Sequence, residues 1–249
     1  MISKKGCDIM NLKKTVLRYV MCLSLLLAFS FALLPQMAQA ASGAGWYFNG
    51  GVKNVVNNGA AATIETQNPY VYTGYKYSCS CAWAMTCDRN ADSGGRYAQV
   101  GYTKEPNTSK PYYFYEYSYD DDWTAKTLST SPSVGSHHTY MVGCDSKYMY
   151  FKIDGTSQAR VPLTKIPFSR NKIEIFTETH HTSDQSLGSA ANPVTMGACQ
   201  YKSVSNTWTS TKCVRGSSSA GVGYGTLTTQ RNNIPSSGAS SWEVWDSRY

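Results

Sequence analysis

The sequence has little that would build a helical protein or a membrane protein. After residue 40, no stretch places apolar residues at the spacing of an amphipathic helix. No apolar run reaches the roughly 20 residues that a helix needs to span a bilayer. A serine nucleophile elbow, a P-loop and a dinucleotide-binding fingerprint are also absent from the sequence, which gives no support to those classes of enzyme.

The first 40 residues have the pattern of a secretory signal peptide. Five basic residues within the first 18 precede an apolar run over residues 20–34, and Ala38-Gln39-Ala40 is a small-x-small cleavage site. Cys22 lies before most of the apolar run, which is not the arrangement of a lipoprotein. We therefore expect residues 1–40 to be removed, the protein to be secreted, and residues 41–249 to form one domain.

Charge does not point to a nucleic-acid or membrane partner. The chain holds 23 Lys+Arg and 16 Asp+Glu, for a net charge of +7, but five of the basic residues and one acid lie in the leader. The remaining 18 basic and 15 acidic residues leave a net charge of only +3. We expect the mature form to be a monomer that binds neither nucleic acid nor membrane.

Six cysteines remain after the leader, an even number that is typical of disulfides in a secreted chain. Cys199 and Cys213 flank a segment with the pattern of a hairpin, and we predict that they pair. The pairing of the other four, Cys79, Cys81, Cys87 and Cys144, stays open. Zinc is an alternative for Cys79, Cys81 and Cys87, but their spacing is not that of a zinc knuckle. We therefore predict no metal and no cofactor.

The composition of the mature segment predicts an all-β fold. Short runs rich in Tyr, Val, Ile, Thr and Phe alternate with clusters of Gly, Asn, Ser, Asp and Pro. So many short strands in a domain of this size indicate a two-sheet antiparallel β-sandwich, of the jelly-roll or concanavalin-like type. A Ser/Gly-rich segment around 215–241 is expected to be a loop, and residues 242–246 a closing edge strand. The expected strands are 63–65, 70–77, 82–86, 97–103, 112–119, 138–145, 148–153, 172–179, 195–201 and 243–246.

Three of these segments resemble the motifs of one peptidase family. Gln99-Val100-Gly101 lies in the strand 97–103, an aromatic strand with an embedded Glu covers 112–119, and Glu178 follows in 172–179. A Gln-x-Gly strand, an aromatic strand with Glu and a later strand with a second Glu resemble the glutamic peptidases, or eqolisins. The resemblance covers about a third of the chain and implies a secreted, acid-acting endopeptidase with a polypeptide substrate.

The resemblance also implies roles for single residues. Glu178 would activate water and return the proton to the leaving amine, and Gln99 would stabilise the oxyanion. Phe114 would line the substrate cleft and Glu116 would orient the catalytic groups. Alternation along a strand supports this, since Tyr97 and Gln99 share one face, as do Glu174, Phe176 and Glu178.

Two other functions stay open. Glu174-Ile175-Phe176-Thr177-Glu178 resembles the carboxylate strand of laminarinase-type glycoside hydrolases, with Phe176 where those enzymes have Asp. A non-catalytic sandwich that binds sugar or peptide is the other alternative, because neprosin-like proteins share a similar Gln strand. The histidine pairs 137–138 and 180–181 are expected in loops, with neighbouring rings on opposite faces if they lie in strands.

Overall fold

The computed structural model describes residues 43–88, 95–120, 122–216, 224–225 and 227–249. The expected signal peptide, residues 1–40, lies outside this part of the chain. Within the described residues, no helix is long and apolar enough to cross a membrane. A single turn of 3₁₀-helix, Leu163–Lys165, is the helical element described there, and the remaining elements are strands.

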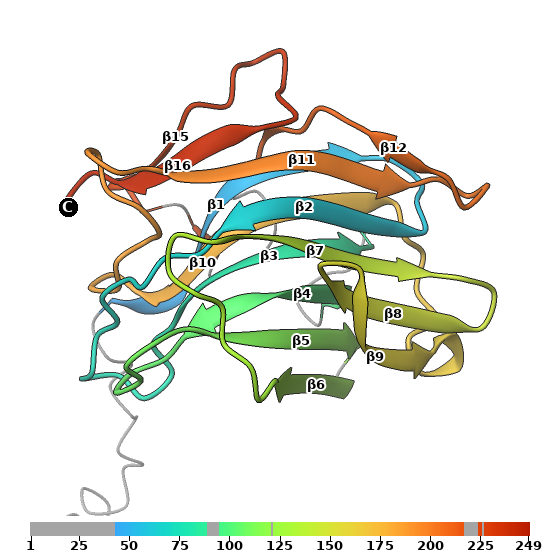
Figure 1. The fold of residues 1–249 in the computed structure, drawn as a ribbon, viewed down its shortest axis with the longest axis horizontal. Coiled ribbons are helices and arrows are strands. Elements are labelled where there is room, and N and C mark those ends of the chain that lie inside the picture. Colours follow the sequence, from blue (N-terminus) through green and yellow to red (C-terminus); the bar gives the residue numbers. More distant parts are fainter. Residues whose placement is uncertain (1–42, 89–94, 121, 217–223, 226) are drawn as a thin grey trace, which may run out of the picture. The chain divides into compact units, whose positions relative to one another are not determined.

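Two antiparallel sheets form a sandwich, as the composition predicts (Figure 1). The first sheet has the strand order β13-β1-β10-β3-β4-β5-β6, and β14 pairs with β1. Its strands are β1 (Ala44–Asn54), β3 (Ser80–Cys87), β4 (Arg96–Lys104), β5 (Tyr112–Tyr119), β6 (Asp122–Thr127), β10 (Lys172–His181), β13 (Val214–Arg215) and β14 (Tyr224–Gly225).

The second sheet has the strand order β15-β16-β11-β2-β7-β8-β9, and β12 pairs with β11. Its strands are β2 (Gly59–Glu65), β7 (His137–Cys144), β8 (Tyr148–Ile153), β9 (Thr156–Pro162), β11 (Val194–Lys202), β12 (Trp208–Ser210), β15 (Gln230–Asn232) and β16 (Trp242–Asp246).

The main hydrophobic core fills the space between the sheets. Strands β3 and β4 of the first sheet contribute small residues, including Ala82, Ala84 and Ala98, all fully buried. The second sheet contributes larger side chains, including Tyr140 and Phe151, which are also fully buried. Because successive residues of a strand point to opposite faces, the alternate residues of β3, β4 and β10 point away from this core.

Three of the sequence expectations for strands are wrong. Residues 70–77 form no strand, because the backbone there is held by side chains of the loop after β10: Tyr70 N–H donates to Gln185 Oε1 and Tyr72 N–H to Asp184 Oδ1. The segment 242–246 is not at an edge, because β15 pairs with it on its outer side. The histidines 180 and 181 end strand β10, and 137 and 138 begin strand β7, so neither pair lies in a loop.

The hairpin expected between Cys199 and Cys213 is present as β11 and β12. Both side chains are fully buried, and the neighbouring Cys213 thiol, together with burial, raises the pKa of Cys199. All six cysteines of the described chain are free thiols in the structure. The disulfide therefore stays a prediction.

Candidate active site

The candidate site lies on the outer face of the first sheet, away from the main core. The register of β10, β3, β4 and β5 arranges this face in rows that cross the strands. Because residues directly opposite each other in an antiparallel sheet point to the same side, each row is a line of neighbouring side chains. A first row holds Glu174, Met85, Gln99 and Glu116; a second holds Phe176, Trp83, Gly101 and Phe114; a third holds Glu178, Cys81, Thr103 and Tyr112.

The second row is an aromatic strip bounded by close backbone contacts. The rings of Trp83 and Phe176 lie 5.5 Å apart between centroids, and Phe48 of β1 packs on both. A Cβ atom on Gly101 would lie 1.9 Å from Ala82 O, and one on Gly50, at the other end of the row, 2.1 Å from Ile175 O. Glycine at these two positions therefore allows the strands to come together around the aromatic pair.

Glu178 is nearly buried and accepts three hydrogen bonds. Trp83 Nε1 donates to Oε2 over 2.8 Å, and His180 Nε2 lies 2.8 Å from Oε1. Cys81 Sγ donates to Oε2 over 3.7 Å. The carboxylate of Glu178, which is 8% exposed, is thus fixed in one orientation by side chains from β3 and from its own strand.

His180 lies between two acceptors. Its Nδ1 is 3.0 Å from the carbonyl oxygen of Tyr77, which can only accept, so Nδ1 carries a proton. Its Nε2 faces the carboxylate of Glu178. Burial lowers the pKa of His180, but the charge and hydrogen bonds of Cys79 and Glu178 outweigh it and raise that pKa to about 12. His180 therefore carries its positive charge beside Glu178 at neutral pH.

Gln99 lies opposite Glu116, which is the centre of a second group of hydrogen bonds. The carboxylate of Glu116 accepts from Tyr97 OH and, over 2.8 Å, from Trp123 Nε1, and the Gln99 amide helps to lower its pKa. Burial raises the pKa of Glu116, these hydrogen bonds oppose the rise, and the charge of Glu178 adds to it. Glu178 and Glu116 therefore influence each other electrostatically across the face.

Glu174 has a different partner. Its Oε1 lies 2.6 Å from Lys172 Nζ on the same strand. Burial raises the pKa of Glu174, and Lys172 opposes the rise. Glu174 is thus held in an ion pair at the Gln99 end of the face.

The structure brings all six residues of the sequence-based site to one face. Gln99 and Glu178 share that face but form no hydrogen bond with each other, since they lie in different rows and β3 runs between their strands. In a flat sheet, this offset of two strands and four residues corresponds to ~16 Å between Cα atoms. Trp83 lies at the midpoint of that diagonal.

Sequence reasoning missed Trp83, His180 and Trp123. His180 follows Glu178 by two residues, so alternation along a strand would have placed it on the same face had the strand been extended to residue 181. The other two depend on strand pairing, which the sequence does not specify. Among the described residues, no group of three His, Cys, Asp or Glu could hold a metal ion.

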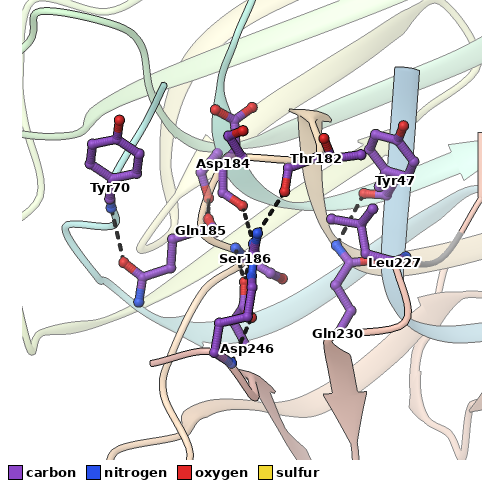
Figure 2. A network of polar contacts seen from close by, with 12 residues as sticks. Tyr47, Tyr70, Thr182, Asp184, Gln185, Ser186, Leu227, Gln230 and Asp246 are labelled. Carbon is purple, nitrogen blue, oxygen red and sulfur yellow. Dashed lines mark hydrogen bonds and ion pairs between the residues drawn. The ribbon is translucent and has the colours of Figure 1, made fainter. Parts of the chain in front are cut away.

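The chain that follows β10 is anchored by buried carboxylates (Figure 2). Asp184 accepts from the backbone N–H groups of Tyr72 and His180. Asp246 of β16 accepts from Ser186 N–H over 3.1 Å and from the Arg248 guanidinium over 2.6 Å. Both carboxylates are fully buried, so they fix the end of β10 on which Glu178 and His180 lie.

Comparison with known proteins identifies the fold. No family model matches the sequence, and no curated protein matches it. Crystal structures of scytalido-glutamic peptidase, with a transition state analog inhibitor and with a peptide-based analog, superpose with a TM-score of 0.51 at 12% identity. Each alignment covers 82% of this chain and 98% of the peptidase chain. At this identity the likeness shows a shared fold and does not by itself show a shared activity.

Two other kinds of structure superpose less well. SCP-B, a member of the eqolisin family in complex with the tripeptide Ala-Ile-His, has a TM-score of 0.49 at 12% identity, over 82% of this chain and 98% of its own. The laminarinase catalytic domain from Thermotoga maritima has a TM-score of 0.37 at 10% identity, over 51% of this chain and 55% of its own. Neither value is high enough to support an argument about function.

Proposed function

We propose that this protein is a secreted hydrolase of the glutamic-peptidase type, which cleaves peptide bonds at acidic pH with Glu178 and Gln99. The observation that carries the proposal is that both residues lie on one outer face of a sandwich shared with scytalido-glutamic peptidase, with Trp83 between them. We place the scissile peptide between Glu178 and Gln99, so that its carbonyl group and a water molecule lie between the two side chains.

The chemistry follows from the groups available. The Glu178 carboxylate takes a proton from water, whose oxygen attacks the peptide carbonyl carbon. The Gln99 amide donates a hydrogen bond to the oxyanion that forms. Glu178 then returns its proton to the amide nitrogen as the carbon–nitrogen bond breaks, so one carboxyl serves as base and as acid. Trp83, His180 and Cys81 keep Glu178 in place for both steps.

The test is hydrolysis of denatured casein between pH 2 and 7 by the secreted protein. Pepstatin, a chelator and a serine-protease inhibitor, none of which should inhibit, exclude contaminating enzymes. We expect Glu178→Gln to abolish turnover and Gln99→Ala to lower it by roughly 10²–10³, because an oxyanion donor is lost. Full activity of Glu178→Gln would refute the dyad.

Glu174→Gln is the control that separates the peptidase from a glycoside hydrolase. Glu174 is a carboxylate of the same strand and the same face, but it is bound to Lys172. A peptidase should keep most of its activity in this variant. A laminarinase-type enzyme should instead lose cleavage of a β-glucan in Glu174→Gln and Glu178→Gln alike, because it needs two carboxylates.

A further inference from the structure

The outer face of the second sheet carries another row of side chains, which the proposed dyad does not use. This row crosses six strands in the order β12-β11-β2-β7-β8-β9 (Figure 1). Two glycines occupy its centre, and each end combines an aromatic ring with a cation. Its members are Trp208, Lys202, Gly59, Gly143, Tyr150 and Arg160.

One of the central glycines, Gly143, lines a hollow in the sheet surface. The hollow has a volume of about 70 Å³ and is lined by Met141, Gly143, Tyr150, Lys152, Lys202 and Trp208. The Trp208 ring lies 3.3 Å from the position that a Cβ atom of Gly143 would take. Trp208 therefore lies over the glycine floor, and Tyr150 rises on the other side of it.

The polar groups around this hollow are mainly cationic. Lys152 Nζ lies 5.9 Å from the centre of the Tyr150 ring, and Lys202 Nζ uses one of its three donors on Cys144 O. The nearby acid, Asp145, accepts from Tyr150 OH and from two backbone N–H groups. Its carboxylate is thus already bound, while the lysines keep free donors.

We propose that this hollow is a binding site for an acidic polysaccharide. A flat sugar ring would lie over the hollow with its apolar C–H face against the Trp208 ring and its edge toward Tyr150. Its carboxylate would meet Lys152 and Lys202, which supply charge-assisted hydrogen bonds. The inference does not depend on the activity of the opposite sheet, because none of these residues belongs to the face that holds Gln99 and Glu178.

Binding of polygalacturonate, measured by isothermal titration calorimetry, tests the site. Trp208→Ala and Lys152→Gln should each weaken binding roughly tenfold, equivalent to about 1.4 kcal/mol. Raising NaCl from about 0.05 to 0.5 M should weaken it further, since salt screens exposed charges. Gly143→Ala should also weaken it, because a Cβ atom there would lie 3.3 Å from the Trp208 ring and would displace that ring.

Trp123→Ala is the matched control, because this tryptophan is exposed on the other sheet. It should bind like the wild-type protein. Equal binding of a neutral glucan, unchanged binding by a folded Trp208→Ala or Gly143→Ala protein, or no binding of polygalacturonate would each overturn the proposal. Tighter binding of single-stranded DNA than of polygalacturonate would also overturn it, since stacked aromatics and cations can bind that polymer as well.

Discussion

The chemistry of the face depends most on how Glu178 is held. A carboxylate with almost no contact with water needs hydrogen bonds to offset the loss of hydration. Glu178 receives them from an indole, an imidazole and a thiol, each from a residue whose place is fixed by strand pairing. His180 is the charged member of this group and distinguishes the site from a lone carboxylate.

The protonation of His180 can be measured directly. At pH 7 we expect ¹⁵N NMR to show protons on both ring nitrogens, because each faces an acceptor and the pKa of His180 is raised. In Glu178→Gln the pKa of His180 should fall, because a neighbouring negative charge is lost. A His180→Asn variant assigns the signal. A neutral ring at pH 7 in the wild-type protein would contradict the proposed pairing.

Residue types and alternation were enough to predict which side chains share the site. The predicted face does carry Gln99, Glu116, Phe176 and Glu178. Side chains alternate between the two faces of a strand, so recognising a strand is enough to decide which of its residues share a face. The offset of Gln99 from Glu178 could not be predicted, since it depends on the register of β3 with both neighbours. The hydrogen bond from Trp83 to Glu178 depends on the same register and could not be predicted either.

At the scale of elements, the sequence did not predict the edge strands β6 and β9 or the glycine-containing strand β1. Strands β6 and β9 are mostly exposed, so their sequences lack a hydrophobic alternation. Strand β1 contains Gly50 and Gly51, which are unusual in strands and resemble a loop signal. Yet Gly50 is required there because it faces the backbone of β10.

Gly101 gives the element-scale prediction. We expect Gly101→Ala to lower the free energy of unfolding by roughly 1–3 kcal/mol, as overpacking does, because its Cβ would collide with Ala82 O and push β3 from β4. Thr127→Ala is the control, since Thr127 ends the same row on exposed β6. Urea denaturation measures both. An equally stable Gly101→Ala protein would show that the strands can separate without cost.

For the whole molecule, buried carboxyls predict a protein that is more stable in mild acid. Burial raises the pKa of Glu116, Glu174 and Asp184 above their ordinary values. Between about pH 4 and their raised pKa values, the folded state therefore binds more protons than the unfolded state, so stability falls as pH rises. Backbone N–H groups lower the pKa of Asp145 to about 2, so the stability that it adds is complete above about pH 5 and no longer changes at higher pH.

We expect the melting temperature to decrease from pH 4.5 to pH 7.5 in differential scanning calorimetry. Glu116→Gln should reduce the slope, because that variant removes one of the titrating groups. Lys147→Gln, a change on the other sheet, should leave the slope unaltered. A melting temperature that rises over this range would mean that the buried carboxyls are ionised without cost.

The place of β10 in the first sheet has a consequence for how the chain acquires its structure. Residues 172–181 pair on one side with β1, the first strand described, and on the other with β3. A nascent chain that ends before residue 172 therefore lacks the strand that joins these two, and β1 stays separated from β3. Pairings so distant in sequence are slow to form. The outer face of the first sheet and the position of Glu178 are thus completed together and late, so a partly synthesised or partly folded chain should lack the proposed hydrolytic activity.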